Sequence, residues 1–272
     1  MPTSAHTHSA GGRTERDDQD RLVRLAEVRR VVSLVPSLTE AVAVTAPGLL
    51  VGATAWCTHP ADLNVARIGG TKNPDIAAIV ALAPDLVLAN EEENRAVDLD
   101  ALRAAGIPVW VTEIRTLDQA LRSLDRMLAV ACGLDRPDWL DRAGEAWRDV
   151  AARADAGRAP VRAIVPIWRR PWMVLGRDTF AGDLLRRLGV EQIYADHAER
   201  YPAIELAQLR AAGADLVVLP DEPYRFTAQD GPEAFPGLPA TLVDGRYLTW
   251  YGPSLMLAAE ILGTQLNRIL PL

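Results

Sequence analysis

Short runs of apolar, often β-branched residues alternate with helical patterns along most of the chain. Three of these runs are Arg30–Leu34, Leu50–Ala53 and Leu86–Ala89, and a segment with apolar residues at helical spacing lies between consecutive runs. This alternation is typical of βαβ units, in which neighbouring strands run parallel. We therefore predict an α/β fold with parallel sheets.

Two pairs of residues have the spacing of a helix-capping box. Ser37 and Glu40 form one pair, and Thr116 and Gln119 form the other. In such a pair the first side chain accepts a hydrogen bond from the backbone N–H three residues on. The sequence therefore predicts helices that begin at Ser37 and Thr116.

The two halves of the chain repeat one pattern of helix, turn and strand. In the first half the pattern runs from Ile76 to Asn90, and in the second from Ile204 to Asp221. A long helical stretch, residues 138–156, lies between the halves, and we expect its Trp139 and Trp147 to be packing residues. The repeat predicts two α/β lobes joined by a single long interlobe helix, with a ligand cleft between the lobes.

The domain boundaries follow from this pattern. We predict a disordered polar N-terminal tail and lead-in over residues 1–29, an N-terminal α/β lobe over 30–136, an interlobe helix over 137–157 and a C-terminal α/β lobe over 158–272.

Charge and composition exclude some classes of protein. The net charge of −7 argues against a nucleic-acid surface, which needs a basic stripe. Cys57 and Cys132 are far apart, so we expect two core residues rather than a disulfide framework or a zinc site.

No stretch reaches the roughly 18 apolar residues of a membrane helix. Residues 1–30 have no apolar segment typical of an export signal, which predicts a cytoplasmic protein, with export as the alternative if the start site is wrong.

Several motifs resemble those of a known family. They are RVVSLVPSLTEAV, LVGATAWCTHP and ARIGGTKNPDIAAIVALAPDLVLA in the first half, and YPAIELAQLRAAGADLVVL and WYGPSLMLAAEIL in the second. Their order and spacing resemble the helical-backbone (class III) periplasmic substrate-binding proteins of ABC importers for cobalamin, haem and ferric siderophores. The similarity extends from about Arg30 to Leu270. It implies two Rossmann-like lobes, a rigid interlobe helix and a small-molecule ligand such as a corrinoid, haem or ferric chelate.

The resemblance also predicts how the chain differs from importers. Family importers carry one exposed glutamate on each lobe, which docks onto the membrane permease. The corresponding positions here are Ala77 and Ala207. We therefore predict a cytosolic binding protein that does not dock to an ABC permease.

Aromatic and polar residues on the loops after the strands are the candidates for ligand binding. Large rings on such loops offer contact area to a bulky ligand, while arginine, histidine and amide groups supply polar anchors. His59 is also a candidate axial metal ligand, since imidazole binds cobalt and iron. The predicted ligand-binding residues are Ser37, Trp56, His59, Thr71, Asn90, Trp168, Arg169, Arg170, Trp172, Tyr201, Trp250 and Tyr251.

Two other functions remain open at this point. One is a conventional ABC-importer receptor whose export signal is missing from this sequence. The other is an enzyme on the same fold, for which Ser37 or Cys57 near His59 would supply a nucleophile. The sequence contains no nucleophile elbow, P-loop or zinc-ligand cluster, so we predict that the protein is not an enzyme and assign it no resident cofactor.

Overall fold

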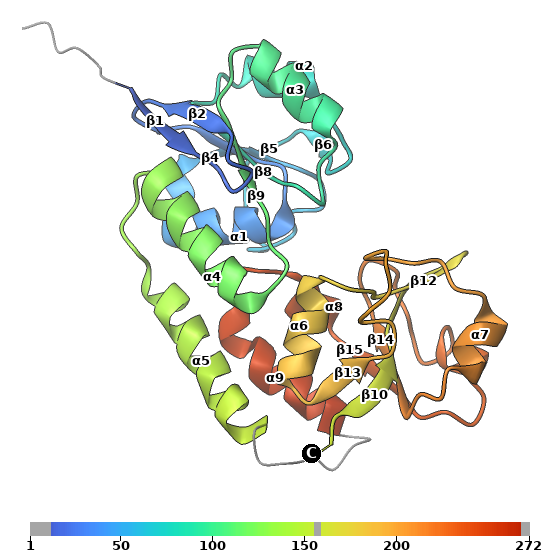
Figure 1. Cartoon of the computed structure of the whole chain (residues 1–272). Helices are drawn as coiled ribbons and strands as arrows, with labels where there is room; N and C mark the ends of the chain where they lie inside the picture. Colours follow the sequence, from blue (N-terminus) through green and yellow to red (C-terminus); the bar gives the residue numbers. More distant parts are fainter. Residues whose placement is uncertain (1–11, 155–158, 268–272) are drawn as a thin grey trace, which may run out of the picture. The chain divides into compact units, whose positions relative to one another are not determined.

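The computed structural model describes residues 12–154 and 159–267, and Figure 1 traces their helices and strands. The chain divides into two compact units. The first unit contains residues 1–113 and 123–136, and the second contains residues 114–122 and 137–272. The chain thus leaves the first unit after Glu113, returns to it at Ser123 and leaves it again after Arg136. The lobe boundaries that we placed at residues 30, 137 and 158 remain predictions.

A five-stranded parallel sheet forms the centre of the first unit, with the strand order β5-β4-β3-β8-β9. Every residue of β8 is buried, as expected for a strand in a parallel sheet. The strands are β3 (Val31–Ser33), β4 (Leu50–Ala53), β5 (Ala66–Arg67), β8 (Leu86–Asn90) and β9 (Val109–Thr112), with the small hairpin β6 (Gly69–Gly70) and β7 (Asn73–Pro74). The helices are α1 (Pro36–Thr45), a 3-10 turn at Pro47–Leu49, α2 (Ile76–Ala81) and α3 (Ala96–Ala104).

A four-stranded parallel sheet forms the centre of the second unit, with the order β13-β10-β14-β15. Its strands are β10 (Val161–Ile164), β13 (Val190–Gln192), β14 (Leu216–Pro220) and β15 (Ala240–Val243), and a separate antiparallel hairpin consists of β11 (Pro166–Arg169) and β12 (Trp172–Val174). The helices are α5 (Asp138–Ala154), α6 (Phe180–Arg187), α7 (Leu206–Ala211), a 3-10 turn at Pro232–Ala234, α8 (Gly245–Thr249) and α9 (Leu255–Asn267). Two sets of parallel strands with helices confirm the predicted fold class.

Helix α4 (Leu117–Arg126) begins as its sequence predicts and continues into a π-helical turn at Met127–Ala131. The Gln119 N–H donates to Thr116 Oγ1 at 3.2 Å, and the Gln119 side chain accepts from the Arg115 N–H at 2.8 Å. Helix α5 packs against α9 in the second unit, where Trp147 Nε1 donates to the Leu255 carbonyl at 3.1 Å. Trp139 and Trp147 are both buried, which confirms their predicted packing role.

Helix α1 begins one residue earlier than predicted. Its N-cap is Val35, which has extended backbone angles and no side-chain cap, and Pro36 occupies the first helical position. Proline suits that position because its fixed φ is helical and its missing N–H would have no partner there. Ser37 is therefore a buried residue inside the first turn rather than a cap.

The N-terminal segment also differs from its prediction. We expected a disordered polar tail and lead-in over residues 1–29, but β1 (Arg13–Arg16) and β2 (Leu22–Leu25) form an antiparallel hairpin, and residues 1–11 lie outside the described part. Val23 and Leu25 are buried, which anchors one face of β2. A hairpin with so few apolar residues has no stability of its own, so tertiary contacts must supply it.

The repeat in the sequence corresponds to a repeated hydrogen-bond pattern at the amino end of each sheet. In the first unit, Asp85 Oδ2 accepts from the N–H groups of Arg29 and Arg30 at 2.8 and 2.9 Å. In the second unit, Asp215 Oδ2 accepts from the Arg162 N–H at 2.9 Å. The backbone N–H of each aspartate returns a bond of 2.8 Å, to the carbonyl of Arg30 or of Arg162. Each aspartate thereby ties the start of its strand to the start of the neighbouring strand.

We expect Asp85→Ala to lower the free energy of unfolding by about 1–3 kcal/mol, because two backbone N–H groups lose a charged acceptor. Asp215→Ala should cost less, since one N–H group loses its acceptor. Urea unfolding followed by tryptophan fluorescence measures both. The matched control is Asp62→Ala, at an exposed aspartate of the first unit. Equal stability of Asp85→Ala and the control would contradict the assigned role.

The turn before each aspartate offers a second test. Ala83 has a φ of 45°, and Gly213, at the matching place in the second unit, has a φ of 69°. A side chain costs roughly 1–2 kcal/mol in this left-handed region. We expect Ala83→Gly to stabilise the protein slightly, by less than about 1 kcal/mol, and Gly213→Ala to destabilise it by about 1 kcal/mol. Thermal unfolding of the two variants should move in opposite directions, and shifts in the same direction would be inconsistent with this account.

Candidate functional site

The carboxyl ends of the strands in the first unit carry an exposed tryptophan and a histidine. Trp56, on the loop after β4, is 68% exposed. A Cβ placed on Gly70 would lie 3.7 Å from its indole nitrogen, so the ring lies beside the β6–β7 turn that contains Thr71. His59, on the same loop, is half-buried, and its Nδ1 lies 3.1 Å from Thr58 Oγ1. The loop thus brings Trp56 close to the turn of Thr71.

Asn90, at the end of β8, organises the next loop with its side chain. Its amide nitrogen donates to the carbonyl and the hydroxyl of Thr112 at 3.0 and 3.1 Å. Its amide oxygen accepts from the N–H groups of Glu92 and Glu93. Asn94 closes this loop, since its Oδ1 accepts from the Asn90 N–H at 2.9 Å and its Nδ2 donates to the Thr71 carbonyl at 3.0 Å. Asn90 therefore holds the loop in place through both polar atoms of its side chain.

The β11–β12 hairpin contains four of the predicted residues, and the structure gives them different roles. Trp168 is 42% exposed and packs edge-on against Tyr224. Trp172 stacks on Phe226 at 6.0 Å and packs against the core cluster of the second unit. The guanidinium of Arg169 lies 5.4 Å from the Trp172 ring centroid.

The two arginines of this hairpin differ in their partners. Arg169 forms ion pairs with Asp230 and Glu233, so its charge is already balanced within the unit. Arg170 is exposed, and among the described residues its guanidinium has no ion-pair partner. A groove of about 350 Å³ adjoins the hairpin, lined by Arg169, Arg170, Pro171, Trp172, Ala203, Ile204, Glu205 and Leu206.

Trp250 and Tyr251, between α8 and α9, are buried rather than exposed. Trp250 Nε1 donates to Glu222 Oε2 at 3.0 Å, and Tyr251 packs edge-on against Phe180. Tyr201 is half-buried, with the Arg200 guanidinium 5.7 Å from its ring centroid. The predicted ligand-binding residues do not include Glu222, although its place on the loop after the buried strand β14 was a signal for it.

Three carboxylates gather at the carboxyl ends of β14 and β15. The pairing of Pro220 with Val243 places Asp221 and Asp244, which follow them, at one edge of the sheet. Asp221 accepts from the Gly245 N–H at 2.6 Å, and Asp244 caps α8 through the Arg246 N–H at 3.1 Å. Burial raises the pKa of Glu222; Asp221 and Asp244 raise it further, while the Trp250 hydrogen bond and the Arg246 charge lower it.

The two candidate nucleophiles, Cys57 and Ser37, are both buried. Cys57 is buried, and its thiol lies 3.0 Å from Thr39 Oγ1 and 3.2 Å from Thr54 Oγ1. Burial raises the pKa of this thiol, which keeps it protonated and unreactive at neutral pH. Ser37 is buried in the first turn of α1. Across residues 12–154 and 159–267, no three His, Cys, Asp or Glu side chains form a metal-binding group.

Comparison with known proteins assigns the family. The family model described as "Periplasmic binding protein" matches residues 31–231. The chain belongs to the periplasmic binding protein family. This assignment confirms the resemblance seen in the sequence, and members of this family are binding proteins.

Individual family members are similar over nearly their whole length. A vitamin B12-binding protein of Pectobacterium carotovorum is 23% identical over 251 residues, which cover 89% of this chain and 90% of that protein. The solved periplasmic vitamin B12-binding protein of Vibrio cholerae has a TM-score of 0.74 at 20% identity, covering 89% of this chain and 98% of its own. A periplasmic haem-binding protein in complex with two haems has a TM-score of 0.73 at 23% identity, covering 88% and 98%. These structures share the fold.

Ala77 and Ala207, the positions that we matched to docking glutamates from the sequence resemblance, are both exposed. Ala77 and Ala207 are the second residues of α2 and α7, and neither helix has an acidic residue in its first turn. The N-cap residues differ, because Asp75 caps α2 through the Ala78 N–H whereas Glu205 makes no such bond to α7. Among the described helices, none has the length and apolar character required to cross a membrane.

Replacing Glu222 by glutamine tests the electrostatics of the carboxylate cluster. The glutamine amide would still accept from Trp250 but would carry no charge. Because the native pKa of Glu222 lies above its ordinary value of 4.5, the native state binds more protons than the unfolded state above that pH. We expect the wild type to lose stability relative to Glu222→Gln as the pH rises from 4.5 through the native pKa.

Urea unfolding at a series of pH values measures this difference. Glu191→Gln, at an exposed glutamate on β13, is the matched control. A constant stability difference between wild type and Glu222→Gln from pH 4 to 8 would show that the surroundings of Glu222 do not raise its pKa.

Proposed function

We propose that this protein binds a corrinoid, that is, a cobalamin-like metal chelate, on the loops that follow the carboxyl ends of its strands. The observation that carries the proposal is the exposure of two large rings on these segments, Trp56 and Trp168. A monomeric protein gains nothing in stability from exposing such rings, whereas a bulky, partly apolar ligand gains contact area from them. The vitamin B12-binding relatives support the same ligand class.

The charges at these loops favour a corrinoid over haem. In the second unit Asp221, Glu222 and Asp244 share one sheet edge, and in the first unit Glu91–Glu93 follow β8. A corrinoid ring carries amide groups whose N–H bonds donate to carboxylates, while haem carries two carboxylates that the same groups repel. Arg169, which would otherwise attract an anionic ligand, is paired with Asp230 and Glu233.

A second part of the proposal is that the protein does not dock to a permease through helices α2 and α7. Ala77 and Ala207 present methyl groups where importers present carboxylates, and an alanine has no group to pair with an arginine of a permease. Cytoplasmic location is a further part of the proposal, whereas membership of a family of periplasmic proteins favours the alternative of an exported importer receptor. Fractionation of the native host with an antibody against this protein separates the two.

Titration with candidate ligands tests the binding proposal. We expect cyanocobalamin or cobinamide to quench tryptophan fluorescence saturably, and haemin or a ferric siderophore to bind at least about tenfold more weakly, a difference of about 1.4 kcal/mol. Trp56→Ala should weaken corrinoid binding by about tenfold, because truncating a ring at the centre of a contact costs more than about 1 kcal/mol. Val97→Ala, at an exposed apolar residue on α3, is the matched control.

The same titrations contain the outcomes that would overturn the proposal. Tighter binding of haemin than of either corrinoid would contradict the proposed ligand class. Flat titrations with all four ligands would show that the ligand is not a metal chelate of this kind. His59→Ala tests the axial-ligand role separately: if His59 binds the metal, the variant loses the shift in the visible spectrum of the bound corrinoid.

A further inference from the structure

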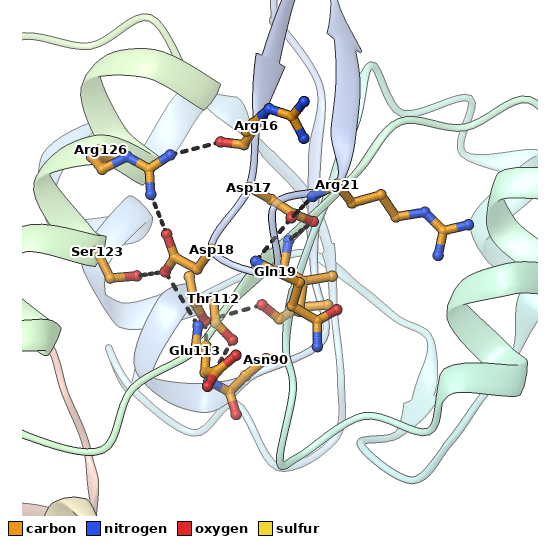
Figure 2. A network of polar contacts seen from close by, with 12 residues as sticks. Arg16, Asp17, Asp18, Gln19, Arg21, Asn90, Thr112, Glu113, Ser123 and Arg126 are labelled. Atoms are coloured by element: carbon orange, nitrogen blue, oxygen red, sulfur yellow. Dashed lines mark hydrogen bonds and ion pairs between the residues drawn. The ribbon is translucent and has the colours of Figure 1, made fainter.

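The N-terminal hairpin covers the edge strand of the first sheet with its turn. Asp17 shapes the turn, because its Oδ1 accepts from the N–H groups of Gln19 and Arg21 at 3.0 and 2.9 Å. The Asp18 N–H donates to the Val111 carbonyl at 3.1 Å, and the Val111 N–H donates to Asp17 Oδ2 at 3.4 Å. The exposed backbone of β9, which a sheet edge normally leaves open, thus finds partners in the turn (Figure 2).

Asp18 joins this turn to two further segments of the first unit. Its Oδ2 accepts from the Glu113 N–H at 3.2 Å and from the Ser123 hydroxyl, and its Oδ1 forms an ion pair with Arg126 (Figure 2). Arg126 also donates to the Arg16 carbonyl at 2.6 Å, so its guanidinium binds the hairpin at both Asp18 and Arg16. The carboxylate of Asp18 is only 10% exposed, which limits its screening by solvent.

Asp18 binds the two residues that flank segment 114–122, which belongs to the second unit. Glu113 is the last residue of the first unit before segment 114–122, and Ser123 is the first residue after it. Segment 114–122 has its own polar contacts within the second unit, where the Leu117 N–H donates to Asp183 at 3.0 Å. The carboxyl end of β9 therefore has no continuation within its own unit, and Asp18 supplies the anchor there.

A path of hydrogen bonds, joined by the backbone between Glu113 and Thr112, leads from this anchor to the candidate ligand loops. The hairpin turn contacts Val111 and Glu113 at the carboxyl end of β9, and Thr112 lies between these two residues. Its hydroxyl donates to the Ala89 carbonyl at 3.1 Å, and its carbonyl accepts from the Glu91 N–H at 2.9 Å and from the Asn90 amide at 3.0 Å.

The path ends at the loops themselves. The Asn90 side chain accepts from the N–H groups of Glu92 and Glu93. The Asn94 side chain donates to the Thr71 carbonyl in the β6–β7 turn, and the Trp56 ring lies beside Gly70 of the same turn. The positions of loop 91–94 and of the β6–β7 turn thus depend on where the end of β9 is fixed. Figure 2 shows Asp18, Glu113, Thr112 and Asn90 following one another along this path.

We propose that Asp18 is a positioning residue for ligand binding, which fixes the carboxyl end of β9 and, through Thr112 and Asn90, the loops that meet the ligand. This inference rests on the proposed function, since it assumes that these loops contact the ligand. The family model matches residues 31–231 and so begins after the hairpin. The hairpin is therefore a part of the molecule to which the family assignment gives no role.

Hydrogen exchange and ligand titration of Asp18→Ala test the proposal. In the ligand-free protein, we expect the amides of residues 90–94 and of Glu113 to exchange at least about tenfold faster than in the wild type. The dissociation constant for cyanocobalamin should rise about tenfold at 25 °C, where the variant is still folded. Asp18→Asn keeps one acceptor oxygen and should restore part of both properties.

Asp85→Ala is the matched control, because it weakens the same sheet at the opposite end. It should lower the midpoint of thermal unfolding while leaving the exchange of residues 90–94 and the dissociation constant within about twofold of the wild type. If Asp18→Ala behaves like this control, Asp18 has a structural role alone and the proposal is wrong. Ser123→Ala, which removes one partner of Asp18, supplies the same comparison should Asp18→Ala not fold.

The experiment separates this inference from the proposed function. If the wild type binds no corrinoid but exchange at residues 90–94 depends on Asp18, the proposed ligand is wrong and the positioning path stands. If the wild type binds a corrinoid and neither exchange nor affinity depends on Asp18, the positioning role is wrong and the proposed function stands.

Discussion

Each unit depends on one aspartate at the amino end of its sheet. Asp85 and Asp215 lie just before buried strands, and their carboxylates accept from backbone N–H groups at the start of the neighbouring strand. This bond sets how two parallel strands start relative to each other. The carboxyl ends of these parallel strands lie at the opposite edge of each sheet, and the candidate ligand residues lie on the loops that follow them.

Sequence alone was sufficient for the elements that a local pattern of residues announces. The repeat around Asp85 and Asp215, the cap at Thr116 and the packing of Trp139 and Trp147 all follow from spacing and apolar pattern. The N-terminal hairpin was missed for the opposite reason. Its turn is polar, and its partners Glu113, Ser123 and Arg126 lie more than ninety residues away in the chain. No pattern within the segment carries that information.

The predicted site residues show the same limit in a different form. Trp56, Trp168, Trp172 and Trp250 look alike in the sequence, because each falls on a predicted loop. The structure leaves the first two exposed, places Trp172 against the core cluster and buries Trp250 beside Glu222. What separates them is the presence of side chains from distant segments, such as Phe226 and Phe235 around Trp172. A sequence pattern identifies rings on loops but not the neighbours that cover them.

Arg169 illustrates how distant neighbours also decide charge. In the sequence it is one of two adjacent arginines suited to bind an anion, yet Asp230 and Glu233 neutralise it within the unit. Glu222 is the reverse case, since burial and two nearby carboxylates raise its pKa while only Trp250 and Arg246 oppose them. A ligand that covers Glu222 removes water from this carboxyl group, and the loss must be offset by donors on the ligand. The sheet edge that holds Asp221, Glu222 and Asp244 is therefore electrostatically better suited to groups that donate N–H bonds than to groups that bring further negative charge.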